Sequence, residues 1–257
     1  MLPVTMAIFG MLLVLSTVVA KAEPLKVGIA AEPYPPFILR DSSGNWVGWE
    51  IEIIDALCAE AKLQCTITPT VWDAMIPSLT TGKIDLIAAM FITEERRKII
   101  DFSDRYYKTP TVIVGTRDTK MGASPMDLQG RTLGVQVATV HEVYARKHFA
   151  STVDQIRVYQ TQDDAEQDLV AGRIDALQAD AVVVEKFLAS AAGKTCCEVK
   201  GRVADDEDVL GLGAGMGLRK GNAPLREKLN AAIESIRENG RYREISKKYF
   251  AFDIYGN

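Results

Sequence analysis

Apolar and polar residues follow two different periods along this chain, one typical of strands and one typical of helices. Strand-like apolar runs cover residues 25–30, 65–70 and 84–90, and the stretches 51–61 and 74–81 between them carry apolar side chains at helical spacing. Strands that alternate with helices in this order predict a parallel sheet covered by helices.

The same succession returns in the second half of the chain. A strand-like run at 132–136 precedes a helical stretch at 141–149, a strand-like run at 156–159 and a further helical stretch near 181–191. We therefore predict an α/β fold with two lobes, each built on a mixed, mostly parallel sheet.

A seven-residue pattern occurs once in each half. It reads LTTGKID at Leu79–Asp85 and LVAGRID at Leu169–Asp175. In both copies an apolar helical stretch ends at a glycine, the residue that most easily adopts the left-handed conformation at a helix C-terminus, and a strand-like run follows. Arg96 lies eleven residues after the first copy and Asp180 five after the second. A ligand held between the lobes would meet a cation from one and an anion from the other.

The pattern also indicates where the chain passes between the lobes. We assign residues 23–109 and 214–257 to lobe one and residues 110–205 to lobe two. The chain crosses a hinge at the first boundary, and residues 206–213 form the second hinge crossing.

Charge excludes one class of partner. The 257 residues contain 30 Lys and Arg against 34 Asp and Glu, a formal net charge of −4. The basic residues are scattered, so the chain has no electrostatic footprint for nucleic acid.

The first 22 residues have the pattern of an export signal. An apolar stretch at Val4–Val19 is short for a membrane span, and Ala20-Lys21-Ala22 places small residues where a signal peptidase reads them. We expect cleavage after Ala22 and a periplasmic protein. The alternative is an uncleaved anchor, because no Lys or Arg precedes the apolar run.

The four cysteines fall into two pairs. Cys58 near the end of a predicted helix and Cys65 at the start of a strand are separated by a turn that can bring them to bridging distance, although two buried thiols are the alternative. Adjacent Cys196 and Cys197 are not expected to bridge each other easily, and no further ligand lies at metal-binding spacing. We expect them to be structural or redox-silent, and we expect no metal.

Several short motifs, in order along the chain, give a family resemblance. They are Tyr34–Phe37, Gly48–Ile53, Ile76–Leu79, Ile92–Arg96, Asp101–Asp104 and Lys248–Phe250. The chain resembles the family 3 extracellular solute-binding proteins of bacterial ABC importers, most closely the lysine/arginine/ornithine-, histidine- and opine-binding proteins. The resemblance implies a type II, Venus-flytrap fold and a monomer without cofactor that delivers a polar, basic amino acid to an inner-membrane ABC permease.

The resemblance also implies roles for the two charged residues. Arg96 falls where the family's arginine binds the ligand α-carboxylate, a task suited to its planar fork of donors. Asp180 falls where the family's acid binds the α-ammonium. Without the resemblance, Arg96 reads as a solvated helix charge and Asp180 as a helix N-cap.

Four further positions match the ligand site of the basic amino-acid binders. Tyr34 and Trp72 fall where aromatic rings flank the ligand side chain, although Trp72 could simply pack the lobe. Thr139 and Val140 begin the first helix of lobe two, where backbone N–H groups favour an anion.

Departures from the family pattern leave the ligand open. Ala89 and Phe91 stand where small hydroxyl residues are usual, and Val140 replaces a threonine. Glu32 is the nearest candidate for the acid that binds the basic side chain of the ligand in the relatives. The alternative is that Glu32 is simply exposed at the surface. The acid favours a basic ligand, whereas the apolar substitutions favour a less polar one.

Two other functions remain as alternatives. Some proteins of this fold are periplasmic cyclohexadienyl dehydratases, and Glu32 would then be a general acid. A zwitterion clamp of Arg96 and Asp180 argues against it, because Asp180 would repel a substrate with two carboxylates. A ligand-sensing binding protein that acts through a receptor partner is the second alternative.

Overall fold

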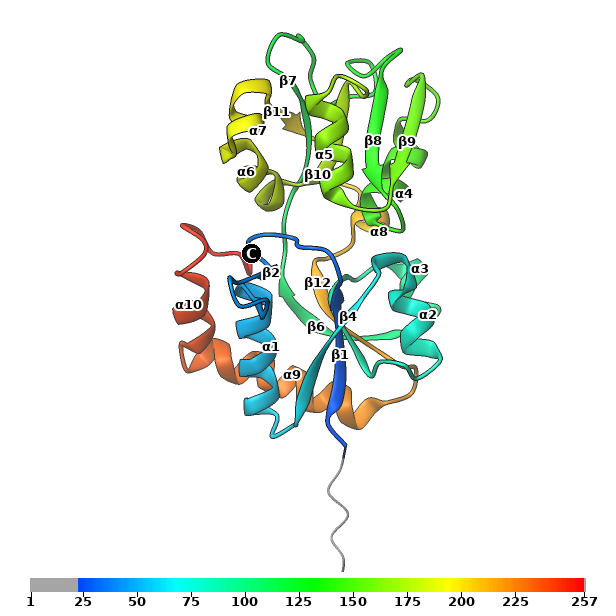
Figure 1. Ribbon diagram of the computed structural model, residues 1–257. Helices are drawn as coiled ribbons and strands as arrows, with labels where there is room; N and C mark the ends of the chain where they lie inside the picture. The colour runs from blue at the N-terminus through cyan, green and yellow to red at the C-terminus, as the bar shows by residue number, and fades with distance from the viewer. Residues whose placement is uncertain (1–22, 257) are drawn as a thin grey trace, which may run out of the picture.

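The chain folds into two α/β lobes, one above the other (Figure 1). The computed structural model describes residues 23–256, so the predicted signal segment 1–22 lies outside the described residues. None of the helices in residues 23–256 combines the length and apolar character needed to cross a membrane.

Lobe one contains a five-stranded sheet of order β4-β1-β5-β12-β6. Its strands are β1 (Leu25–Ala30), β4 (Cys65–Thr70), β5 (Leu86–Phe91), β6 (Asp101–Tyr107) and β12 (Ala214–Leu218). Its helices are α1 (Trp49–Glu60), η1 (Trp72–Ala74), α2 (Met75–Thr80), α3 (Glu94–Arg97), α9 (Ala223–Glu238) and α10 (Arg241–Ser246). Helices α1, α9 and α10 cover one face of this sheet, and α2 and α3 lie on the other side (Figure 1). A short hairpin of β2 (Leu39–Arg40) and β3 (Trp46–Val47) precedes α1.

Lobe two contains a five-stranded sheet of order β11-β7-β10-β8-β9. Its strands are β7 (Thr111–Thr116), β8 (Thr132–Gln136), β9 (Gln155–Tyr159), β10 (Ala176–Asp180) and β11 (Cys197–Arg202). Its helices are α4 (Val140–His148), α5 (Gln162–Val170), α6 (Ala181–Ala189) and α7 (Ala191–Cys196).

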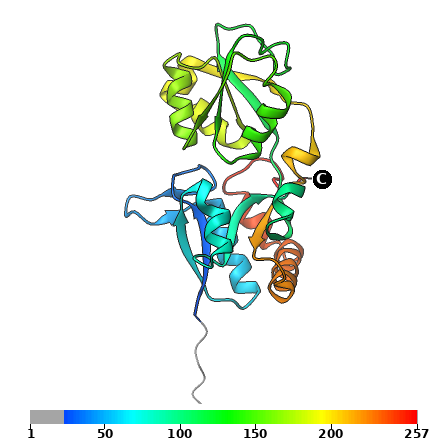
Figure 2. The same ribbon diagram turned by 90° about the vertical axis from the view of Figure 1, so that its right-hand side faces the viewer.

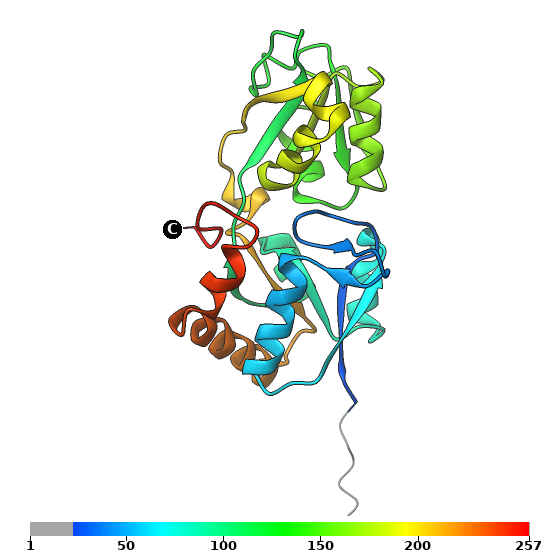
Figure 3. The same ribbon diagram turned by 60° about the vertical axis from the view of Figure 1, so that its left-hand side comes forward.

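Two chain segments join the lobes, and both turned views show them side by side (Figure 2, Figure 3). One follows β6 and leads into β7; the other contains the one-turn helix α8 (Glu207–Leu210) and leads into β12. Sequence analysis assigned the second segment only as a crossing, because four residues are too few to show helical periodicity.

The sheets are mixed as expected, but only half of the pairings in each are parallel. The pairs β1–β4, β1–β5, β8–β9 and β8–β10 are parallel, whereas β12 and β7 pair antiparallel with both of their neighbours. Strands β12 and β7 are the ones that enter a lobe from a crossing. They run away from the junction between the lobes, opposite to their neighbours, and therefore pair antiparallel.

The repeated LxxGxID-type segments perform the same task in both lobes. Gly82 and Gly172 end α2 and α5 with φ of 76° and 68°, in the left-handed region. The aspartate that follows then accepts a hydrogen bond from a strand of its own lobe, β1 in lobe one and β8 in lobe two. Asp85 Oδ2 accepts from Lys26 N at 3.0 Å, and Asp175 Oδ2 accepts from Thr132 N at 2.7 Å. The two-lobe prediction thus rests on a true structural repeat.

The predicted disulfide is confirmed. Cys58 on α1 and Cys65 at the start of β4 are bonded, with their Cα atoms 6.2 Å apart. The bridge ties the end of α1 to the edge strand of the first sheet, at the end of β4 remote from the junction between the lobes.

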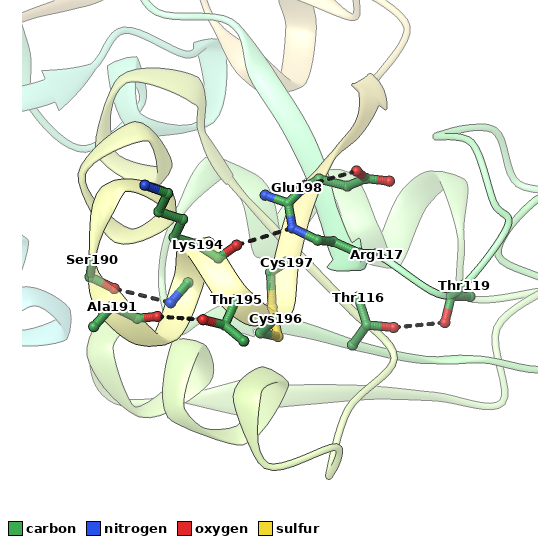
Figure 4. Close-up of a disulfide and its surroundings, with 11 residues drawn as sticks. Thr116, Arg117, Thr119, Ser190, Ala191, Lys194, Thr195, Cys196, Cys197 and Glu198 are labelled. Carbon is green, nitrogen blue, oxygen red and sulfur yellow. Dashed lines mark hydrogen bonds and ion pairs between the residues drawn. A yellow bond between two sulfur atoms is a disulfide. The ribbon is translucent and has the colours of Figure 1, made fainter.

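The expectation that the two adjacent cysteines do not readily bridge each other is wrong. Cys196 and Cys197 form a disulfide, with Cα atoms 3.7 Å apart (Figure 4). Helix α7 ends at Cys196 and strand β11 begins at Cys197, and this change from helix to strand brings both sulfur atoms to the same side of the chain. Cys197 is fully buried in the core of lobe two.

Candidate functional site

All nine residues predicted to bind the ligand line a single cavity between the lobes. Lobe one contributes Glu32, Tyr34, Trp72, Ala89, Phe91 and Arg96, and lobe two contributes Thr139, Val140 and Asp180. The strands β1, β5, β8 and β10 end at this cavity, so residues that are far apart in the sequence meet here.

Arg96 projects from α3 into the cavity. Its Nη1 donates to the carbonyl oxygen of Phe91 at 2.9 Å, and its Nη2 donates across the cleft to the carbonyl oxygen of Ala138 at 3.0 Å. None of the ion pairs among residues 23–256 includes Arg96. Burial lowers its pKa to about 10, which leaves the guanidinium charged at neutral pH. Its charge is therefore available to an anion in the cavity, unlike that of exposed Arg97, which pairs with Glu94.

Asp180 ends β10 and is 5% exposed. Although it occupies the N-cap position of α6, its side chain makes no capping hydrogen bond. Its Oδ1 accepts from Thr109 Oγ1 at 2.5 Å and its Oδ2 accepts from Tyr34 Oη at 2.9 Å. Burial by itself would raise the pKa of Asp180, but nearby His141 and these hydrogen bonds outweigh burial and hold the pKa below its ordinary value. The cavity therefore contains a stable anion opposite Arg96.

The two aromatic residues and Glu32 line the lobe-one part of the cavity. Tyr34 and Trp72 are half-buried, and Trp72 also packs against the core beside α2. Glu32 is half-buried rather than fully exposed, and its Oε1 accepts from Gln136 Nε2 of lobe two at 3.1 Å. Burial raises the pKa of Glu32, partly offset by this hydrogen bond.

The first turn of α4 faces the cavity with backbone donors. Thr139 caps the helix: its hydroxyl donates to the carbonyl oxygen of Gln136 at 2.7 Å and accepts from Glu142 N at 3.2 Å. That hydroxyl is therefore already engaged. Among the described residues, the N–H groups of Val140 and His141 have no hydrogen-bond partner, so the helix start offers N–H groups to an anion.

Ala89 and Phe91 contribute apolar surface and backbone groups. Ala89 N donates to Tyr106 Oη at 2.7 Å, and the Phe91 carbonyl orients Arg96 as described. Neither side chain can hydrogen-bond a ligand, so the charged contacts must come from elsewhere in the cavity.

Sequence analysis missed several lining residues, of which His141 and Glu50 carry chemistry. His141 is 4% exposed, with Nε2 3.7 Å from Asp180 Oδ2 and Nδ1 3.3 Å from Thr111 Oγ1. It directly follows Val140, so its position in the sequence was a usable signal. Glu50 lies within the Gly48–Ile53 motif, which by itself predicts only the start of a helix.

Besides the bond from Thr109 to Asp180 at the hinge, three hydrogen bonds among the described residues cross the cavity from one lobe to the other. They join Tyr34 to Asp180, Glu32 to Gln136 and Arg96 to the backbone of Ala138. The lobes are thus closed on each other around the cavity, and opening would break all three bonds.

Comparisons with known proteins agree with this architecture. The model of the bacterial extracellular solute-binding proteins, family 3, matches residues 25–252. The chain is 39% identical over 240 residues to the L-arginine-binding protein of Pseudomonas aeruginosa, covering 93% of this chain and 92% of that protein. It is 38% identical over 244 residues to the histidine-binding periplasmic protein of Salmonella typhimurium, covering 94% of each.

A solved structure has the same arrangement of lobes. An ancestral arginine-binding protein bound to arginine aligns with a TM-score of 0.79 at 33% identity, covering 89% of this chain and 98% of that chain. The chain belongs to family 3 of the bacterial extracellular solute-binding proteins.

Proposed function

We propose that this protein is the periplasmic substrate-binding component of an ABC importer and that its ligand is a basic amino acid or a close derivative. The observation that carries the proposal is the pairing of Arg96 and Asp180 across one cavity, with backbone N–H groups of α4 beside them. A free guanidinium and a buried carboxylate match the α-carboxylate and α-ammonium of an amino acid.

The remaining site residues have supporting roles in this proposal. Tyr34 and Trp72 contact the aliphatic part of the ligand side chain, and their ring faces suit a guanidinium or ammonium group. Glu32 supplies negative charge toward the same side chain. Val140, Ala89 and Phe91 exclude water, which strengthens the charged contacts.

Binding is coupled to closure of the lobes. A ligand that contacts Arg96 in lobe one and Asp180 in lobe two gains both contacts only in the closed form, so it shifts the population toward that form. Residues 23–109 with 214–257, and residues 110–205, are the two bodies that move. The segment 206–213 and the short link after residue 109 absorb the rotation.

We infer that the chain is exported by its first 22 residues, works as a monomer and delivers its ligand to an inner-membrane ABC permease.

We also propose that it is a binding protein and not an enzyme. A dehydratase acting on a dicarboxylate would have to place that substrate beside Asp180, whose low pKa keeps it charged. Both of its oxygens accept hydrogen bonds, from Thr109 and Tyr34, so this ionised carboxylate has no proton to donate as a general acid.

Calorimetric titration of residues 23–257 tests the proposal. Arginine, lysine, ornithine and histidine are titrated alongside glutamine, leucine, phenylalanine and prephenate, after a thermal-shift survey of the same compounds. We expect at least one basic amino acid to bind at micromolar concentration or tighter. Turnover of prephenate, or failure of every amino acid to bind, would refute the proposal.

A further inference from the structure

Glu50 is a second acidic residue of lobe one that lines the ligand cavity. It is the second residue of α1 and is 1% exposed. The preceding residue, Trp49, is fully buried, and its Nε1 donates to Ser246 Oγ at 3.0 Å. This packing fixes the start of α1 and therefore the position of the Glu50 carboxyl group.

The Glu50 carboxyl group is only half satisfied by the protein. Oε1 accepts from Tyr106 Oη, whereas Oε2 is buried and has no hydrogen-bond partner among the described residues. Tyr106 cannot serve both oxygens, because it has a single proton. A buried carboxyl oxygen without a partner is unfavourable unless something outside the protein binds it.

No cation within residues 23–256 neutralises this group. None of the ion pairs formed within residues 23–256 involves Glu50. The strand ends around the cavity contribute Ile29, Ala30, Ala88 and Ala89, which have no polar side-chain atoms.

Glu32 is less suited than Glu50 to be the only acid that binds a charged ligand side chain. It is half-exposed, and one of its oxygens is bonded to Gln136 across the cleft. A charged contact is weaker at a partly solvated carboxyl group, whereas an ion pair with a buried carboxyl group is strongly charge-selective.

We propose that Glu50 binds the cationic end of the ligand side chain, so that the site selects amino acids that carry a guanidinium or ammonium group. The inference rests on the proposed function, in which Arg96 and Asp180 hold the α-carboxylate and the α-ammonium. Glu50, at the start of α1 in lobe one, then makes the third charged contact with the ligand.

The proposal makes ligand binding a proton-linked event. Burial raises the pKa of Glu50 to about 8. The titratable groups that face it are Tyr106 and Tyr107 on β6 and Tyr242 on α10, and burial raises the pKa of each of them, so all three are neutral at pH 7. The carboxyl group is thus largely protonated before binding. A cation that binds beside Glu50 stabilises its ionised form, so the carboxyl group releases its proton to the buffer.

The first experiment compares arginine with citrulline, its uncharged isostere, by calorimetry. For Glu50→Gln we expect arginine to bind at least about thirtyfold more weakly and citrulline to change less than about threefold. Glu52→Gln is the matched control: Glu52 lies two residues along the same helix, outside the cavity, and bonds Lys248 and Tyr249. Glu52→Gln should leave the affinities for arginine and citrulline unchanged. Equal effects of Glu50→Gln on the two ligands, or no effect on arginine, would overturn the proposal.

The second experiment needs no variant and therefore does not depend on how the variant folds. Titration of arginine at pH 7 in buffers of different ionisation enthalpy should show release of about 0.9 proton per arginine more than for citrulline, as a group with a pKa of about 8 predicts. Because both ligands carry the same α-ammonium, any response of His141 and Asp180 cancels. An equal proton count for the two ligands overturns the assignment of Glu50, whereas failure of wild-type protein to bind any amino acid overturns the proposed function.

Discussion

Tyr34 and Asp180, 146 residues apart in the sequence, meet across the cleft: the tyrosine hydroxyl donates to the carboxylate at 2.9 Å. Because the partners belong to different lobes, this bond exists only when the lobes are closed. The same carboxylate is the proposed anchor of the ligand ammonium. Closure and recognition therefore share the side chain of Asp180, so a substitution at Tyr34 should alter ligand affinity although Arg96 and Asp180 are both retained.

We predict that Tyr34→Phe weakens ligand binding about tenfold, because the free energy of one hydrogen bond to a charged group corresponds to a change of this size in affinity. It should also raise the radius of gyration of the ligand-free protein in small-angle scattering, because the closed form loses a contact that the open form never had. Tyr159→Phe is the matched control, since Tyr159 donates a similar bond to Asp168 within lobe two. Identical affinities for the two variants would show that the Tyr34 bond does not stabilise closure.

We predict that Arg96→Ala abolishes measurable binding while the fold persists. Loss of a buried charged contact costs roughly 2 to 5 kcal/mol, or about thirtyfold to several thousandfold in affinity. Arg97→Ala is the control, because Arg97 is the next residue on α3, is exposed and pairs with Glu94. Calorimetry on both variants, with circular dichroism to verify folding, decides the matter. Near-normal affinity in Arg96→Ala would remove this residue from the site.

Much of this architecture was predictable because it is encoded locally. Strand and helix periods gave the two lobes, and the repeat of Leu79–Asp85 at Leu169–Asp175 has the same hydrogen bonds in both copies. All nine residues expected from the family resemblance line one cavity. Each of these signals lies within a short stretch of chain, where spacing and residue type are sufficient.

The features that were missed depend on contacts between distant residues. Nothing near Glu50 in the sequence shows that Tyr106 donates to one of its oxygens and that the other has no partner within the described part of the chain. His141 acquires its relation to Asp180 only when α4 packs against the end of β10. The Cys196–Cys197 bridge depends on a change from helix to strand at a single peptide, which periodicity cannot resolve.

The Cys58–Cys65 bridge should stabilise the fold without affecting the site. Closing a loop this short contributes about 2 to 3 kcal/mol to the free energy of unfolding in the chain-entropy model. We predict a loss of that size in the double variant Cys58→Ser/Cys65→Ser by urea denaturation. Ligand affinity should stay within about threefold of wild type, because the bridge lies at the end of lobe one remote from the cavity. A loss below about 0.5 kcal/mol would contradict this account.

Glu50 should also make the stability of the ligand-free protein depend on pH. An unfolded glutamate has its ordinary pKa of 4.5, whereas burial raises the pKa in the folded protein to about 8. The folded state therefore holds a proton that the unfolded state has released, and this favours folding most at low pH. The contribution is fully present below pH 4.5 and is lost as the pH rises toward 8, with an upper limit of about 5 kcal/mol.

The measurement compares the free energy of unfolding of wild type and Glu50→Gln between pH 4.5 and pH 8.5. Glutamine cannot ionise, so we expect the variant to gain stability relative to wild type steadily across this range. Glu166, whose pKa burial raises to about 7, changes stability in the same direction in both proteins and cancels in the difference. In saturating arginine we expect wild type to be the more stable of the two proteins. The ligand stabilises the ionised Glu50 of wild type, whereas the variant has no charge at this position. A difference between the two proteins that does not change with pH would mean that Glu50 is ionised in the empty cleft, and the proton-linked part of the binding scheme would fail with it.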